Sequence, residues 1–170
     1  MQLKWIGAAL VIIGCGGWGC MLASGYRKQE LLLRRLCSLL RSMRWELRYR
    51  LTAVPDLCRM ASKEVSGELR IVFQELAREL DSHRLPDASA CMQAVLRGHE
   101  ALPPAAKRLL RQLGKTLGRF DLEGQLESME NVIRDCEAEQ NAMKQELQIR
   151  LKSCRTLAFC TGFALVILFI

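Results

Sequence analysis

Two uncharged apolar stretches, one near each end of the chain, limit the possible folds more than any other feature. The first, Trp5–Tyr26, holds 22 residues, and the second, TLAFCTGFALVILFI at 156–170, holds 15. A bilayer core of ~30 Å is crossed by a helix of about 20 such residues. We therefore predict three parts: an N-terminal transmembrane helix at 1–26, a domain at 27–155 and a C-terminal transmembrane helix at 156–170.

The second stretch is short for a transmembrane helix. Its 15 residues rise only ~22 Å, so it crosses a bilayer only if the lipid thins locally or the preceding turn contributes. Whether the tail crosses completely stays open at this point. The alternative is a hydrophobic helix end that is buried in the core of a protein.

Basic residues lie at the inner edges of both stretches and predict which way the domain faces. They are Arg27, Lys28, Arg34, Arg35, Arg150, Lys152 and Arg155. Positively charged residues beside transmembrane helices stay in the cytoplasm. We expect a multi-pass protein of the cell membrane whose domain faces the cytoplasm and whose two termini lie on the other side.

Two motifs in the first stretch allow other interpretations. Gly14, Gly16 and Gly19 match the G-x-G-x-x-G pattern of dinucleotide-binding folds, but the alternating strands and helices of such a fold do not follow. Ile12–Cys15 resembles a lipoprotein attachment box, but the apolar run continues for 11 residues past it. We therefore interpret the glycines as small residues that let transmembrane helices approach closely.

The middle domain is predicted to be an all-α helical bundle, because its apolar residues recur at helical spacing and Pro and Gly fall only at the joints. No strand pattern of convincing length is present. About six helices are expected, at 27–51, 55–63, 68–81, 87–97 and 104–118, followed by a long C-terminal helix that begins after Asp121 as its N-cap. Ser66 is the candidate N-cap of the third helix.

Two helix starts share a short sequence pattern. Thr52 or Ala53 is expected to cap the second helix, with Pro55 in its first turn and Asp56 where the helix dipole favours an acid. The segment LPDASACM begins the fourth helix in a similar way. The parallel is either the trace of a repeated helical hairpin or two independent uses of a common helix start.

Eight cysteines are many for a chain of 170 residues. No pair forms C-x-x-C, and the spacings match no zinc pattern. Cys37, Cys91 and Cys136 fall at positions that the predicted helices bury. We expect the cysteines to be small buried hydrophobic side chains in a reducing compartment.

The first helix of the domain has a leucine-rich stripe and a strongly basic opposite face. Arg41, Arg44 and Arg48 lie on the basic face, and Trp45 and Tyr49 lie four residues apart on it. We take these five as candidate contacts for an acidic partner or for anionic lipid headgroups. The simpler interpretation is a solvated face that obeys the positive-inside rule. No recognised motif supports nucleic acid binding.

No sequence motif for catalysis, cofactor binding or metal binding is found. The chain lacks G-x-x-x-x-G-K-[ST], H-E-x-x-H and G-x-S-x-G. His83 and His99 have no cysteine or carboxylate arrangement near them in the sequence. The acids of the last helix alternate with Arg and Lys, as on a solvated or partner-facing surface. We expect no enzymatic activity, no cofactor and no metal site.

The stretch LRQLGKTLGRFDLEGQ, residues 110–125, resembles the signature region of the stage III sporulation protein AB family. That family is similar to the inner-membrane platform protein of type II secretion and type IV pilus systems. The resemblance rests on Gly114, Gly118, Asp121 and Gln125, which join the candidate partner contacts, and the end-to-end layout fits as well. One departure is T-A-V-P-D-L where the family commonly has a T-P-L-P-E-A type segment.

The resemblance implies a scaffold in a channel-like apparatus between mother cell and forespore that endospore formation requires. It places the protein on the mother-cell side of the forespore envelope. The implied partners are a secretion-type ATPase, other stage III channel subunits and membrane lipids, with a homo-oligomer left open and no nucleic acid expected. The alternative is a peripheral protein that binds anionic lipid or nucleic acid through the basic helix at 27–50.

Overall fold

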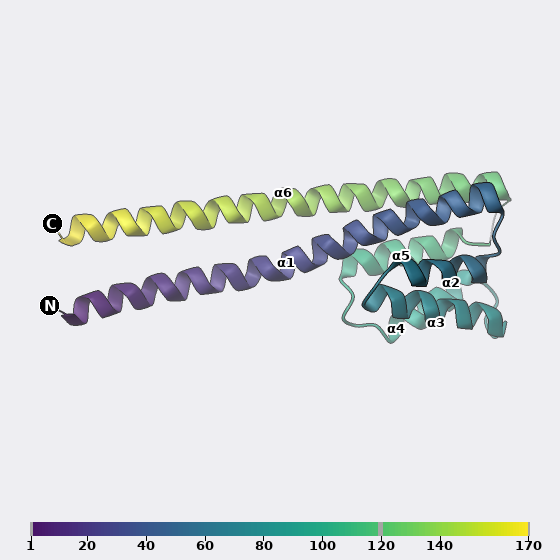
Figure 1. Ribbon diagram of the computed structural model, residues 1–170, viewed down its shortest axis with the longest axis horizontal. Helices are drawn as coiled ribbons and strands as arrows, with labels where there is room; N and C mark the ends of the chain where they lie inside the picture. Colours follow the sequence, from purple (N-terminus) through teal and green to yellow (C-terminus); the bar gives the residue numbers. More distant parts are fainter. Residues whose placement is uncertain (1, 119–120, 170) are drawn as a thin grey trace. The chain divides into compact units, whose positions relative to one another are not determined.

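The computed structural model describes residues 2–118 and 121–169. Six helices occur in these residues: α1 (Gln2–Arg50), α2 (Val54–Glu64), α3 (Glu68–Ser82), α4 (Ala88–Arg97), α5 (Pro104–Thr116) and α6 (Leu122–Phe169). No strand occurs in the described ranges (Figure 1). The predicted all-α fold with six helices and a long last helix is therefore confirmed.

The chain divides into two compact units. One consists of Met1–Glu30 with Asn141–Ile170, and the other is Leu31–Gln140, called the bundle unit below. Among the residues that the structure describes, no helix has a segment both long and apolar enough to cross a membrane. The predicted transmembrane segments at 1–26 and 156–170 consist mainly of residues whose side chains lie outside this description. Both segments stay predictions.

Within the bundle unit, α2 to α5 pack in sequence order: α2 against α3, α3 against α4 and α4 against α5. The parts of α1 and α6 that belong to the unit lie along these four helices (Figure 1). Short joints between successive helices favour such neighbouring, antiparallel packing. The core lies between the helices and is almost entirely aliphatic, with Phe73 of α3 fully buried in it.

α1 is one uninterrupted helix of 49 residues, where the sequence suggested a transmembrane helix followed by a separate domain helix. In the bundle unit most of its predicted apolar stripe is buried, through Leu33, Leu36, Leu39, Leu40, Met43 and Leu47, whereas Leu31 is exposed and Leu32 is half-buried. Burial of each such side chain contributes ~1.5–3 kcal/mol. Tertiary packing of this stripe, more than helix propensity, therefore stabilises the helix here.

Turn residues fix where α2 and α3 begin. Ala53 is the N-cap of α2 and Pro55 lies in its first turn, as predicted. α3 begins after Gly67, whose φ of 73° lies in the left-handed region that glycine adopts without strain. The prediction that Ser66 caps α3 is wrong. The Ser66 hydroxyl instead accepts a hydrogen bond from Arg35 Nη1 of α1, at 3.1 Å.

The two similar Pro-Asp pairs begin their helices in different registers. Pro55 and Asp56 lie inside the first turn of α2, whereas Pro86 precedes α4 and Asp87 is its N-cap. Asp87 Oδ1 accepts a hydrogen bond from the backbone N–H of Ala90 at 2.7 Å. The sequence parallel is therefore two different helix starts with similar composition.

The first part of α6 is held in the bundle unit by apolar burial and by polar pairs. Its buried side chains are Met129, Val132, Ile133 and Cys136. Its polar pairs are Glu130–Arg44 and Glu137–Arg41 with α1, and Asp135–Gln112 and Glu139–Arg108 with α5. These four acids, expected on a solvated or partner-facing surface, are engaged within the chain.

Candidate partner-binding surface

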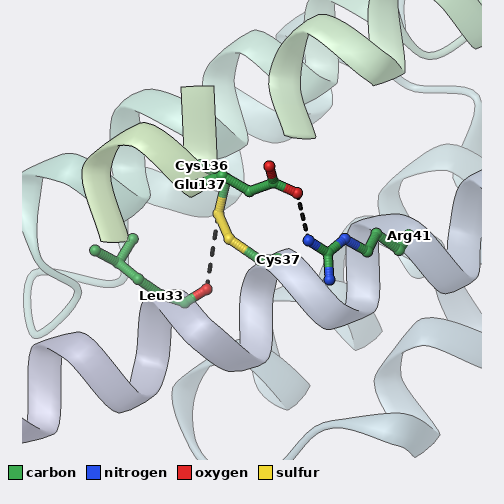
Figure 2. Close-up of a disulfide and its surroundings, with 5 residues drawn as sticks. All are labelled: Leu33, Cys37, Arg41, Cys136 and Glu137. Atoms are coloured by element: carbon green, nitrogen blue, oxygen red, sulfur yellow. Dashed lines mark hydrogen bonds and ion pairs between the residues drawn. A yellow bond between two sulfur atoms is a disulfide. The ribbon is translucent and has the colours of Figure 1, made fainter. Parts of the chain in front are cut away.

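The basic face of α1 is partly neutralised by α6. Arg41 forms an ion pair with Glu137 (Figure 2), and Arg44 Nη1 lies 3.0 Å from Glu130 Oε2. Ion pairs of this exposure contribute ~0–1 kcal/mol each. These two candidate contacts therefore help to pack α6 on α1, and their charges are only partly available to an external ligand.

Trp45, Arg48 and Tyr49 form an exposed cluster near the end of α1. Trp45 is 54% exposed and Tyr49 is 64% exposed. Their ring centroids are 5.1 Å apart with the planes tilted by 42°, and Arg48 Cζ lies 5.8 Å from the centre of the Tyr49 ring. Three- and four-residue spacing brings these side chains together on one helix face. Trp, Tyr and Arg are the residue types enriched in binding hot spots.

Leu51, two residues after Tyr49 in the sequence, is also exposed, although the sequence pattern did not single it out. It is 66% exposed, and its φ of 52° lies in the left-handed region, where a leucine is strained. Its position at the break after α1 was the one signal available in the sequence. The residues Trp45, Arg48, Tyr49 and Leu51 are called the aromatic patch below.

Gly114 and Gly118 of the 110–125 segment each occupy a position that favours glycine, for different reasons. Gly114 is buried, and a Cβ there would lie 2.7 Å from the Cβ of Met92 and 3.3 Å from the carbonyl oxygen of Ala88. It therefore permits the close approach of α5 to α4. Gly118 follows the end of α5 with a φ of 72°, a left-handed conformation that favours glycine.

Asp121 and Gln125 define the start of α6. Asp121 Oδ1 accepts a hydrogen bond from Gly124 N at 3.3 Å, which confirms the predicted N-cap. Gln125 is only 6% exposed, and its Nε2 has no hydrogen-bond partner among the described residues. The ion pairs Arg41–Glu137 and Arg44–Glu130 show that α1 and α6 are antiparallel in the bundle unit. The start of α6 therefore lies at the same end of the unit as the end of α1, where the aromatic patch is (Figure 1).

His99 lies between two carboxylates that are distant in sequence, a site that the sequence did not reveal. Its side chain is 11% exposed, Nδ1 is 2.8 Å from Glu68 Oε2, and Nε2 is 3.0 Å from Glu75 Oε2. Both ring nitrogens can donate only in the protonated imidazolium. The cluster ties the joint between α4 and α5 to α3.

The pKa of His99 follows from these neighbours. Burial lowers it, but hydrogen bonds to Glu75 and Glu68 and their negative charges outweigh burial and raise the pKa above its usual value of 6.5. Among the described residues, no group of three or more His, Cys, Asp or Glu side chains is placed to hold a metal ion.

Cys37 of α1 and Cys136 of α6 form a disulfide (Figure 2), which corrects the expectation that these two cysteines are unpaired hydrophobic side chains. Their predicted burial is confirmed, since Cys37 is 3% and Cys136 0% exposed. The bond joins positions 99 residues apart in the sequence, with Cα atoms 5.8 Å apart. In the reduced form, the Cys136 thiol can donate to the carbonyl oxygen of Leu33, 3.7 Å away. Spacing alone could not reveal a pair this distant.

Cys58 and Cys91 are free and buried, as predicted. Burial, together with the charge of Asp81, raises the pKa of the Cys58 thiol to about 12. Such a thiol carries almost no thiolate at neutral pH and reacts slowly. The side chains of Cys15, Cys20, Cys154 and Cys160 lie outside the described residues.

Three comparisons place the chain among known proteins. The family model described as stage III sporulation protein AB (spore_III_AB) matches residues 4–170. A relative from Bacillus subtilis (strain 168), stage III sporulation protein AB, is 22% identical over 169 residues, which covers 98% of this chain and 99% of the relative. A solved structure of stage III sporulation protein AB (SpoIIIAB) has a similar fold, with a TM-score of 0.64, 20% identity, and coverage of 71% of this chain and 97% of the other.

Proposed function

The chain belongs to the stage III sporulation protein AB family, and from this premise we propose that it is a membrane-anchored scaffold of the channel complex between mother cell and forespore. The family match extends over both uncharged stretches and the domain between them. A scaffold needs a rigid body and exposed contacts, and the bundle unit offers a well-buried core with the aromatic patch on its surface.

The scaffold docks a secretion-type ATPase, and the aromatic patch is the observation that carries this part of the proposal. Trp45, Tyr49 and Leu51 are each more than half exposed, although they are large apolar side chains. An exposed apolar cluster of this kind on a protein surface marks an interaction site. The family's resemblance to secretion platform proteins supports an ATPase as the partner.

Charge distribution supports a cytoplasmic position for the bundle unit. Basic residues border it on both sides in the sequence, with Arg27 and Lys28 after the first uncharged stretch and Lys152 before the second. Positive charges beside transmembrane helices favour the cytoplasmic side. We place the unit in the mother-cell cytoplasm, held by transmembrane helices at 1–26 and 156–170.

The alternative function, binding of anionic lipid or nucleic acid through residues 27–50, has weaker support. Such binding requires several basic side chains that are free to contact phosphates. Arg41 and Arg44 are paired with Glu137 and Glu130, and Arg50 lies 3.5 Å from Glu46. The face therefore presents less positive charge than its sequence implies.

Cross-linking from the bundle unit in sporulating cells tests the proposal. Lys63 and Lys115 are exposed residues that an amine-reactive cross-linker can reach. We expect products that contain the secretion-type ATPase and stage III channel subunits. Cross-links to neither class of protein would contradict the scaffold function, and links to a second copy would reveal a homo-oligomer.

A further inference from the structure

The aromatic patch combines exposed apolar area with an arginine, Arg48, that has no carboxylate partner in the part of the chain that the structure describes. Trp45, Tyr49 and Leu51 are 54%, 64% and 66% exposed, within seven consecutive residues. Elsewhere in the described part of the bundle unit, the exposed large apolar side chains are Leu31, Ile71 and Leu122, at 39–44%. Apolar exposure is thus concentrated at the end of α1.

The charges around the patch differ in whether they are already neutralised. Arg41, Arg44 and Arg50 each have a carboxylate partner, in Glu137, Glu130 and Glu46 respectively. Arg48 has no carboxylate partner among the described residues and instead lies over the ring of Tyr49. A single free guanidinium beside two aromatic rings matches one carboxylate flanked by apolar side chains.

The backbone at Leu51 gives an independent indication. A leucine with a φ of 52° is strained, and its side chain is left in water where it gains nothing from burial. Strained residues of this kind cluster at binding sites, where the surroundings hold them in place. A partner that covers Leu51 would recover the missing burial.

We propose that the aromatic patch is a docking surface for an acidic protein segment. A carboxylate of that segment pairs with Arg48, while neighbouring apolar side chains pack on Trp45, Tyr49 and Leu51. The inference rests on the proposed function in one respect, since it assigns the segment to the docked ATPase. A lipid surface fits less well, because lipid binding by basic segments uses clusters of four to eight free Lys or Arg side chains.

Binding of the purified ATPase to the full-length chain in detergent tests this inference. The patch variants are Arg48→Glu and the double variant Trp45→Ala/Tyr49→Ala. The controls are Arg78→Glu, an exposed arginine of α3, and Ile71→Ala, an apolar side chain of α3 that is 43% exposed. All five positions are on the surface, and thermal unfolding verifies that each variant folds.

We expect both patch variants to bind the ATPase about tenfold more weakly or worse, with both controls close to the wild type. An acid-to-Arg change in the ATPase segment should restore binding to Arg48→Glu. If the wild type binds the ATPase and the patch variants bind equally well, the patch inference is wrong, and the ATPase docks at another surface of the scaffold. If the wild type binds no ATPase, the proposed docking itself fails.

Two further measurements test whether the patch binds lipid or a second copy of the chain instead of an acidic protein segment. Vesicles that contain phosphatidylglycerol and self-association of the chain are assayed with the same variants. We expect neither to change in the patch variants. A loss confined to vesicle binding or to self-association, with ATPase binding intact, would overturn the inference in favour of lipid or of a second copy.

Discussion

Individual residues of the bundle unit stabilise the fold through complementary shape and charge as well as through burial of apolar area. Phe73 is fully buried and fills the core, whereas Gly114 contributes by having no side chain where α5 meets α4. Protein interiors are close-packed, so an added methyl group is felt as strongly as a missing one. At His99 the complementarity is electrostatic, because each ring nitrogen lies within hydrogen-bond distance of a carboxylate.

Replacing Gly114 with alanine is expected to destabilise the protein by ~1–3 kcal/mol, because the new Cβ would lie 2.7 Å from the Cβ of Met92. Thermal unfolding of the full chain measures the change. Gly98→Ala is the matched control, since its added Cβ would meet only Val95 O at 3.6 Å. Equal melting temperatures for the two variants would contradict the close packing of α5 on α4.

The His99 cluster predicts that part of the stability depends on pH. Because the folded-state pKa of His99 is raised above 6.5, its stabilising effect is complete below the unfolded pKa and is lost as the pH rises through the folded pKa. Subtracting the melting temperature of His99→Gln from that of the wild type, over about pH 5 to 9, isolates this effect. We expect the difference to be largest at acid pH. A difference that grows with pH would refute the cluster.

At the scale of helices, caps and covalent links decide where elements start and how they stay together. Asp87 caps α4 through its side chain, whereas Asp56, in the first turn of α2, pairs with Arg59 three residues later. The disulfide between Cys37 and Cys136 and the ion pairs at Arg41 and Arg44 attach α6 to α1. Similar short sequences thus serve different purposes.

Loss of the α4 cap has a predictable cost. Asp87→Ala should lower the free energy of unfolding by ~0.5–2 kcal/mol, because the Ala90 N–H loses its acceptor. Asp87→Asn should retain most of the stability, since its amide oxygen can accept the same bond. Chemical denaturation of the three proteins measures this order. An alanine variant with the same free energy of unfolding as the wild type would exclude capping by Asp87.

Reduction of the disulfide should destabilise the bundle unit by ~2–5 kcal/mol, because the bond closes a loop with a sequence separation of 99. Melting temperatures with and without a reducing agent measure this, and the double variant Cys37→Ala/Cys136→Ala should not respond to the agent. Alkylation of the unfolded, non-reduced chain followed by mass measurement counts its thiols. If Cys37 and Cys136 are both alkylated in that experiment, the bond is absent.

For the molecule as a whole, the sequence predicted local features better than distant pairings. Apolar spacing, Pro55 and Asp121 predicted the bounds of α2 to α5 and the start of α6 within a few residues, whereas α1 begins well before the predicted start at residue 27. The contacts of His99 with Glu68 and Glu75, and the bond between Cys37 and Cys136, depend on packing between helices, which periodicity does not encode. For the candidate surface, Trp45 and Tyr49 were identifiable from their spacing. Leu51 was not, because its exposure follows from the turn after α1.

The proposed scaffold function requires that the bundle unit is held at the membrane by both ends and faces the cytoplasm. Its most direct test is protease accessibility of an epitope inserted between His83 and Arg84, two exposed residues of the joint before α4. Protoplasts and inverted membrane vesicles from sporulating cells are treated in parallel. We expect the epitope to survive in protoplasts and to be digested in inverted vesicles. Digestion in intact protoplasts, with protection in the vesicles, would contradict the proposed function.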